Sequence, residues 1–348
     1  MMSEKMNILV TGGTGAIGTW VTRNIVEKGL HPVVYDIFPP GKYLADVLGQ
    51  ITFIQADTLD LDTLISTIKT SNVQRIIHMA KHTPQDQPLA ALKSNVLGSA
   101  NVLEAAKTNH ITRVVYTSSH SVYGYIEAKE GQLPVITEDY PKFDREDPRF
   151  IPYYTLTNKM VEYFGIRFAM DYNLEFVITR FGSTFGPGKI ESRQERSMLG
   201  IKIHDDDSES VPKLGGHLAS FIIDSAIRGK PLRFSEGRDH KSNLVYFKDI
   251  AEGVVLSALS DKIQFIDNHR DFHFDAGKAA TFDDLIEAIK KHIPDASVDM
   301  GPGKLKGGKH PDPEVVFDLT RGNKELGYFP RYVDLEKAVA DYITMYRK

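Results

Sequence analysis

The stretch Gly12-Gly13-Thr14-Gly15-Ala16-Ile17-Gly18 decides how the rest of this chain is organised. The apolar run Ile8-Leu9-Val10 precedes it and is typical of a short buried strand, and a helical pattern from Trp20 to Lys28 follows it. Glycines in such a turn let the backbone approach a pyrophosphate, and the helix presents free N–H groups to that charge. The spacing predicts a dinucleotide-binding turn, with contacts from Gly12, Thr14, Gly15, Ala16, Ile17 and Gly18. A glycine turn with a purely structural role is the alternative.

The composition is that of an ordinary globular protein. Hydrophobic residues make up 41% of the 348 residues and charged residues 25%. A formal net charge of -4 argues against non-specific nucleic-acid binding, which needs a basic face. The absence of cysteine excludes disulfides, thiol nucleophiles and cysteine metal sites, and the histidines lack metal-binding spacing. With no apolar stretch of membrane-spanning length and no signal-peptide pattern, we expect a cytoplasmic enzyme without a metal.

Strand and helix patterns alternate along the first half of the chain. Further strands are predicted at Pro32–Tyr35, Ile51–Gln55, Arg75–Ala80 and Arg113–Thr117, and an Ala- and Leu-rich helix at Asn95–Lys107. This rhythm indicates a parallel sheet that is covered by helices on both faces. The fold class predicted is therefore α/β, with a doubly wound sheet of the Rossmann type.

Acidic residues follow two of these strands. Asp36 lies about 20 residues past the glycine turn, where a carboxylate accepts hydrogen bonds from the adenosine ribose and repels a 2′-phosphate. This position favours NAD over NADP, unless Asp36 is simply an acidic turn residue. Asp57 follows the third strand and is predicted either to reach the adenine amine or to cap the next helix.

Several ordered blocks of the sequence carry a resemblance to a known family. The blocks are Thr11–Gly18, Ile77–Ala80, Asn95–Ser99, Thr117–Gly124, Arg180–Gly188, Val245–Ala251 and Leu326–Pro330. They resemble the signature blocks of extended short-chain dehydrogenases/reductases, also called the NAD-dependent epimerase/dehydratase family. The resemblance covers most of the chain and leaves roughly residues 125–150 and 189–217 unmatched.

The resemblance implies a molecule with two lobes. Residues 1–182 would form the NAD-binding Rossmann domain. Residues 183–348 would form mainly a smaller substrate-binding lobe, with a segment near 243–260 returning to the first domain. Family members commonly pair through helices, which implies a homodimer. Ligands bind beyond the carboxyl ends of the strands in such sheets, which adds Asp57, Ala80 and Asn95 to the cofactor contacts and brings Ser119 to the same edge.

The family resemblance also implies a Ser or Thr, a Tyr, and a Lys four residues after the Tyr. A tyrosine with an ordinary pKa of about 10 is a poor base until a nearby positive charge lowers that pKa. Ser119 matches the serine, although it can equally cap a turn, and Tyr154 matches the tyrosine. Asn158 stands where the lysine belongs. Assigning Lys159 instead needs a five-residue step, which turns about 140° around a helix and off the face of Tyr154.

An asparagine cannot supply the positive charge. Lys81 follows Ala80, where the family usually keeps a small residue, and it is either the substitute cation or a solvated loop lysine. The candidate catalytic residues are therefore Ser119, Tyr154, Asn158 and Lys81.

The sequence leaves three functions open. The first is an NAD-dependent epimerase, dehydratase or dehydrogenase that acts by hydride transfer on a hydroxyl or carbonyl of a sugar-like substrate. The second is a dehydrogenase of a small non-sugar alcohol or ketone, because Ser242-Asn243 replaces the arginine that nucleotide-sugar enzymes of the family carry. The third is a catalytically impaired NAD-binding regulatory protein, suggested by Asn158. The acidic run Asp205–Glu209 is expected to be a solvated loop.

Overall fold

A computed structural model of the chain describes residues 5–81, 87–124, 126, 133–142, 151–190, 215–305 and 315–348. The acidic run at 205–209 lies outside these residues.

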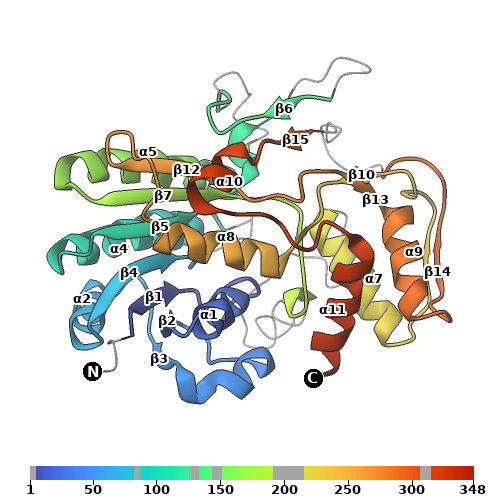
Figure 1. The fold of residues 1–348 in the computed structure, drawn as a ribbon, viewed down its shortest axis with the longest axis horizontal. Helices are drawn as coiled ribbons and strands as arrows, with labels where there is room; N and C mark the ends of the chain where they lie inside the picture. Colours follow the sequence, from blue (N-terminus) through green and yellow to red (C-terminus); the bar gives the residue numbers. More distant parts are fainter. Residues whose placement is uncertain are drawn as a thin grey trace.

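Seven parallel strands form the central sheet (Figure 1). In spatial order these are β12 (His269–His273), β7 (Glu175–Arg180), β5 (Arg113–Thr117), β4 (Val73–His78), β1 (Asn7–Thr11), β2 (His31–Asp36) and β3 (Thr52–Gln55). The order runs outward in both directions from the β1–β4 pair, so a crevice opens beyond the carboxyl ends of these two strands. The doubly wound Rossmann sheet predicted from the sequence is confirmed.

Helices cover both faces of the sheet (Figure 1). They are α1 (Gly18–Glu27) and α8 (Phe247–Leu259) on one face, and α2 (Leu61–Thr70), α4 (Gly98–Thr108) and α5 (Tyr153–Tyr172) on the other. Alternate residues of a strand supply the two cores, as the pleat requires. In β1, Ile8 and Val10 pack under α1, whereas Leu9 packs towards α2 and α4.

The predicted helix at Asn95–Lys107 begins earlier than expected. A helical run starts with α3 (Pro88–Ala91), continues through a π-helical segment η2 (Leu92–Leu97) and passes into α4. Pro88 lies in the first turn, where its fixed φ favours helix formation and its missing N–H costs nothing. Asn95 is therefore inside a helix rather than just beyond a strand.

A third core lies in the C-terminal half of the chain, at the right of Figure 1. It is built from α7 (Gly215–Ile227), α9 (Phe282–His292) and α11 (Leu335–Arg347), with the paired strands β9 (Leu232–Phe234) and β14 (Val298–Met300). The chain returns to the large sheet over a longer stretch than 243–260. Besides α8, the edge strand β12 and the packed helix α10 (Thr320–Leu326) belong to it.

Three further pairs of short strands lie outside the large sheet. They are β8 (Thr184–Phe185) with β11 (Val245–Tyr246), β10 (Lys241–Ser242) with β13 (Ala280–Thr281), and β6 (Val135–Ile136) with β15 (Val316–Phe317). The described residues also form two 3-10 helices, η1 (Lys42–Gln50) and η3 (His120–Tyr123).

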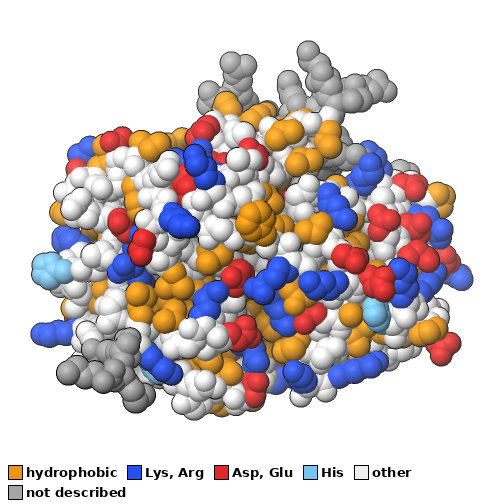
Figure 2. Space-filling view, in the orientation of Figure 1, with side chains coloured by type: hydrophobic (Ala, Val, Ile, Leu, Met, Phe, Trp, Pro, Cys, Tyr) orange, Lys and Arg blue, Asp and Glu red, His pale blue; other side chains and the backbone are white. Residues whose placement is uncertain are grey.

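The surface carries both signs of charge. On the face shown in Figure 2, basic and acidic side chains are interspersed rather than gathered into a field of one sign. Among the helices of the described ranges, none is both long and apolar enough to cross a membrane.

Candidate active site

The glycine turn is a backbone cradle at the carboxyl end of β1. Gly12 has φ +72°, and a Cβ on it would lie 2.7 Å from the backbone nitrogen of Ala80. A Cβ on Gly18 would collide with the carbonyl oxygen of Gly12. Both positions therefore require glycine. The turn leads directly into α1, whose N-cap residue Ile17 gives no side-chain cap in the structure, so the helix start is suited to an anion.

Asp36 connects this turn to the end of β2. Its side chain is buried, and Oδ2 accepts a hydrogen bond from the backbone N–H of Thr14 at 3.0 Å. Oδ1 accepts from the N–H of Phe38 at 3.1 Å. Each carboxylate oxygen has a second acceptor direction, so Asp36 can hold the turn and still bind a ribose hydroxyl. The two interpretations from the sequence are compatible. The cradle and Asp36 fit the adenosine diphosphate half of NAD.

The other three expected cofactor contacts, Asp57, Ala80 and Asn95, differ in their burial and in their hydrogen-bond partners. Asp57 is exposed, and its Oδ1 accepts from the N–H of Leu59 at 3.0 Å, whereas the residue that caps α2 is Asp60. The capping alternative for Asp57 is therefore wrong, because the helix starts three residues later. Ala80 packs its backbone against Gly12, within the crevice. Asn95 is 1% exposed, and its Nδ2 donates to Thr157 Oγ1 of α5 at 3.0 Å.

A group of polar side chains meets where β4, β5 and α5 come together. Tyr154 and Asn158 lie one helical turn apart near the start of α5. The Asn158 Nδ2 donates to the carbonyl oxygen of Tyr154 at 2.8 Å. Its Oδ1 accepts from Lys81 Nζ at 2.6 Å and from the hydroxyl of Tyr116 at 2.8 Å. These four residues form what we call the Lys81 corner.

Lys81 is not a solvated loop lysine. Its Nζ also donates to the carbonyl oxygen of Thr117 and lies 4.3 Å from the ring centroid of Tyr116. The same nitrogen is 5.9 Å from the ring centroid of Tyr154. Burial lowers the pKa of Lys81 to about 7, against the opposing attraction of the Glu162 carboxylate. The ammonium therefore titrates near neutral pH.

Ser119 brings a hydroxyl to Tyr154. Burial raises the pKa of Tyr154, and hydrogen bonds with Ser119 and Asn158 oppose that rise. Ser119 lies two residues beyond the end of β5 and is itself buried. Its Oγ accepts from the N–H of Ser121 at 3.1 Å, which caps η3, so the turn-capping interpretation also holds. A hydroxyl of this kind can orient a substrate oxygen while its backbone stays fixed.

A second buried cluster lies behind this site and was missed by sequence reasoning. Arg180 at the end of β7 forms a two-pronged ion pair with Glu162 of α5, at 2.9 Å for each nitrogen. Its Nη1 lies 2.8 Å from Asp271 of β12. Ser118 donates to Glu162 at 2.5 Å, which links the cluster to the residue before Ser119. The signal in the sequence was that Arg180 follows directly on the apolar run of β7 and its Thr179.

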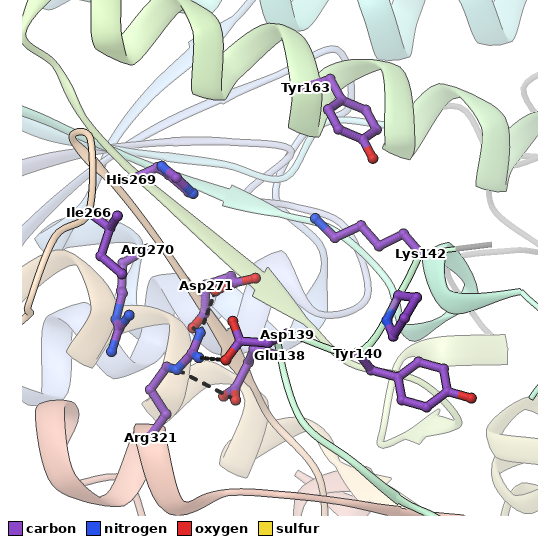
Figure 3. A pocket seen from close by; sticks show the side chains of 11 residues that line it. Glu138, Asp139, Tyr140, Lys142, Tyr163, Ile266, His269, Arg270, Asp271 and Arg321 are labelled. Atoms are coloured by element: carbon purple, nitrogen blue, oxygen red, sulfur yellow. Dashed lines mark hydrogen bonds and ion pairs between the residues drawn. The ribbon is translucent and has the colours of Figure 1, made fainter. Parts of the chain in front are cut away.

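The cluster reaches the surface at the β12 edge of the sheet (Figure 3). A pocket of about 360 Å³ opens there, between the residues after β6, α5 and α10. Arg321 lies on one side, with Asp271 at 2.6 Å, Asp139 at 2.7 Å and Glu138 at 3.6 Å around its guanidinium. Lys142 lines the opposite side and lies 2.9 Å from Glu162 Oε2. We call these groups, with Arg180, the sheet-edge cluster.

Within the described part of the chain, no group of three or more His, Asp or Glu side chains could hold a metal ion.

A glycine turn that leads into a helix at the carboxyl edge of a doubly wound sheet, with an acidic residue at the end of the next strand, is typical of dinucleotide-dependent enzymes. The model of the NAD dependent epimerase/dehydratase family matches residues 8–264. The chain belongs to that family, as the sequence blocks predicted, and is an NAD-dependent enzyme of the extended short-chain dehydrogenase type.

Similar proteins include sugar-nucleotide epimerases. The putative UDP-glucose 4-epimerase of Methanocaldococcus jannaschii is 26% identical over 337 residues, covering 95% of this chain and 90% of that protein. Short-chain dehydrogenase/reductase family 42E member 1 of Macaca fascicularis is 24% identical over 375 residues, covering 97% and 87%. The structure of UDP-glucose 4-epimerase from Thermotoga maritima with UDP-glucose matches with a TM-score of 0.75 at 19% identity, covering 98% of this chain and 99% of that one. That likeness shows the same fold.

Proposed function

We propose that the enzyme oxidises a hydroxyl, or reduces a carbonyl, of a sugar-like substrate with Tyr154 as the acid/base. The single observation that carries this proposal is the contact of Lys81 with Asn158, one helical turn from Tyr154. It brings a cation to the position where the family lysine is missing. Bound NAD supplies the hydride acceptor and donor.

Each residue of the site has a defined task in this proposal. Ser119 holds the substrate oxygen. The Tyr154 tyrosinate takes the proton from a substrate hydroxyl as the carbonyl forms and becomes neutral, and in the reverse direction the neutral Tyr154 hydroxyl donates that proton to the carbonyl oxygen. The Lys81 ammonium stabilises the tyrosinate form of Tyr154. Asn158 accepts a hydrogen bond from Lys81 and thereby fixes the ammonium near Tyr154.

For the cofactor, we propose that the amides of Gly12–Gly18 bind the pyrophosphate and Asp36 the adenosine ribose. Asp57 and Asn95 remain candidate contacts, with Asn95 acting through Thr157. We also propose that the lobe built on α7, α9 and α11 closes over the substrate. The absence of cysteine fits a reducing compartment, and we infer a cytoplasmic location.

One observation favours the alternative of a small non-sugar alcohol or ketone. Asn243 follows Ser242 at the place of the family arginine, and its Nδ2 donates to the carbonyl oxygen of Val315 at 2.8 Å. This amide is engaged with the backbone and offers no bidentate fork for a diphosphate.

A substrate panel tests the proposal. Purified enzyme with NAD is incubated with nucleotide-sugars, free sugar acids and simple ketones, and products are followed by chromatography and NADH absorbance. We expect turnover with a sugar, and a loss of about 10²-fold in Tyr154→Phe. The neighbouring Tyr153→Phe is the matched control, because that side chain is 45% exposed. No turnover of any substrate by an enzyme that binds NAD would favour a regulatory protein.

We further propose that the enzyme is a homodimer that pairs through α5. A stripe of half-exposed apolar side chains runs along this helix at steps of three and four residues. Its members are Tyr153, Leu156, Met160, Tyr163 and Phe164. Phe164→Glu is expected to convert a dimer into a monomer in analytical ultracentrifugation. Phe329→Glu, at a side chain that is 65% exposed elsewhere, is the control.

A further inference from the structure

The cation of this site is delivered from a loop and not from the helix that carries the tyrosine. Lys81 follows β4, and its side chain has four rotatable carbons, so the ammonium needs partners that fix its position. Two of its partners accept hydrogen bonds, namely the carbonyl oxygen of Thr117 and the Oδ1 of Asn158. A third partner is the ring of Tyr116, with its centroid 4.3 Å from Nζ.

Tyr116 contacts both Lys81 and Asn158. The same residue that receives the ammonium on its ring donates its hydroxyl to Asn158 Oδ1 at 2.8 Å. It is 1% exposed and lies in β5, one residue before Thr117. Its ring lies within the core of the sheet, where the ring centroids of His78 and Phe176 are 5.9 Å and 6.1 Å from its own. Its position is therefore set by the core of the sheet and not by the loop.

We infer that Tyr116 is a positioning residue, which holds the Lys81 ammonium beside Tyr154 through its ring and fixes Asn158 through its hydroxyl. The inference rests on the proposed function for its catalytic consequence, but the arrangement itself concerns Lys81, Asn158 and Tyr116 only. A lysine on α5 would be held beside Tyr154 by the helix backbone itself. For Lys81, the contacts with Tyr116 and Asn158 take the place of that backbone.

The groups around Lys81 explain why the aromatic ring of Tyr116 matters for the charge of the lysine. Among the residues that the structure describes, the titratable groups that face Lys81 are Glu162 and Tyr154 of α5, His78 of β4 and Tyr116 itself. Glu162 is already committed to Arg180 at 2.9 Å, and burial keeps His78 neutral by lowering its pKa to about 3. An aromatic face attracts a desolvated ammonium through its quadrupole. Tyr116 thus stabilises the charged form of Lys81 without placing a carboxylate near Tyr154.

The titration of Lys81 tests this directly and without turnover. The pH dependence of its acetylation by trace acetic anhydride, followed by peptide mass spectrometry, gives the pKa of the amine in the folded protein. Tyr116→Leu removes the ring and is expected to lower that pKa by about one pH unit. Phe176→Leu removes a ring from the other side of Tyr116 in the same core, and should leave the Lys81 titration unchanged.

Tyr116→Phe tests the hydroxyl and preserves the core. With the ring kept, the Lys81 titration should stay near that of the wild type. The loss of the hydrogen bond to Asn158 should lower kcat about tenfold with little change in KM and displace the pH–rate profile towards alkaline pH. Phe176→Leu should not displace the profile. If Tyr116→Leu does not fold, this kcat loss and profile shift decide the inference.

Two outcomes separate this inference from the proposed function. If Lys81 titrates as in the wild type in Tyr116→Leu, and Tyr116→Phe keeps wild-type kcat, the positioning role is overturned. If the Lys81 titration moves in Tyr116→Leu but turnover and pH profile do not, the contact is established and the catalytic role of Lys81 is the part that fails.

Discussion

The Lys81 corner and the sheet-edge cluster both bury a cation against α5, but they treat its charge in opposite ways. Lys81 is surrounded by a carbonyl, an amide oxygen and an aromatic ring, and its pKa falls to about 7. The Arg180 guanidinium is fully buried between Glu162 and Asp271, and these carboxylates hold its pKa well above the ordinary value. In return, the pKa of Glu162 falls to about 2.

The difference shows how the fold can use one buried cation for stability and another for proton transfer. Carboxylates compensate a buried cation and fix its charge at every physiological pH, whereas neutral acceptors only orient it. Arg321 extends the fixed charges outward to the pocket at the β12 edge, where three carboxylates surround it (Figure 3). Lys81 can therefore gain or lose its proton near neutral pH, whereas Arg180 and Glu162 keep their charges and hold β7 and α5 together behind it.

The largest expected effect is on stability and comes from breaking the buried ion pair between Arg180 and Glu162. Glu162→Gln leaves the guanidinium of Arg180 buried with less compensation, because Asp271 is its remaining carboxylate partner among the contacts described above. We expect the free energy of unfolding to fall by about 3–5 kcal/mol, measured by urea denaturation.

The matched control for this variant is Glu104→Gln. Glu104 pairs with Lys107 at 2.7 Å, but both side chains are about a third exposed, so the loss should stay below about 1 kcal/mol. Equal effects of the two substitutions would mean that the buried pair adds nothing beyond a surface pair, and the contrast between the two regions would fail.

The second largest effect is expected on activity, when the cation is moved from residue 81 to residue 158 of the Lys81 corner. Lys81→Ala should lower turnover by about 10²-fold and displace the pH–rate profile towards alkaline pH, because Tyr154 loses its cation. Adding Asn158→Lys to that variant places an ammonium one helical turn from Tyr154, and should recover at least about tenfold of the loss. Asn158→Lys alone should be harmful, because it brings two ammonium groups together.

Lys159→Ala is the control for the helix register. It should keep most of the turnover, since the contacts with Tyr154 and Lys81 described for α5 are made by Asn158. A severe loss in Lys159→Ala, in protein that folds and binds NAD, would mean that the lysine has been assigned to the wrong residue.

The sequence predicted five of the seven strands of the sheet, because local signals determine them, but it did not predict β7 or β12. The strand at Arg113–Thr117 was predicted with the bounds that β5 has, since an apolar run between polar turns leaves little choice. The helix before Asn95 was missed because Pro88 at a helix start looks like a loop residue. The contact of Lys81 with Asn158 joins residues 77 positions apart, and only the folded backbone brings them together. The same holds for Tyr116, whose hydroxyl looked like that of any strand tyrosine.

The smallest effect is on the pH dependence of stability, and it isolates the charge of Lys81. The ordinary lysine pKa is 10.5, and the folded protein lowers it to about 7. Between these values the unfolded chain binds a proton that the folded protein has released, so stability rises with pH. Below pH 7 both states carry this proton.

The difference in unfolding free energy between the wild type and Lys81→Met should therefore be flat below about pH 6. It should then move in favour of the wild type by about 1 kcal/mol between pH 7 and pH 8. Other groups that titrate there, such as Lys189 and Asp275, are present in both proteins and cancel. Urea denaturation at four pH values measures this difference. A difference that stays level up to pH 9 would show that Lys81 keeps an ordinary lysine pKa in the folded state, and the contrast with Arg180 would then be one of geometry alone.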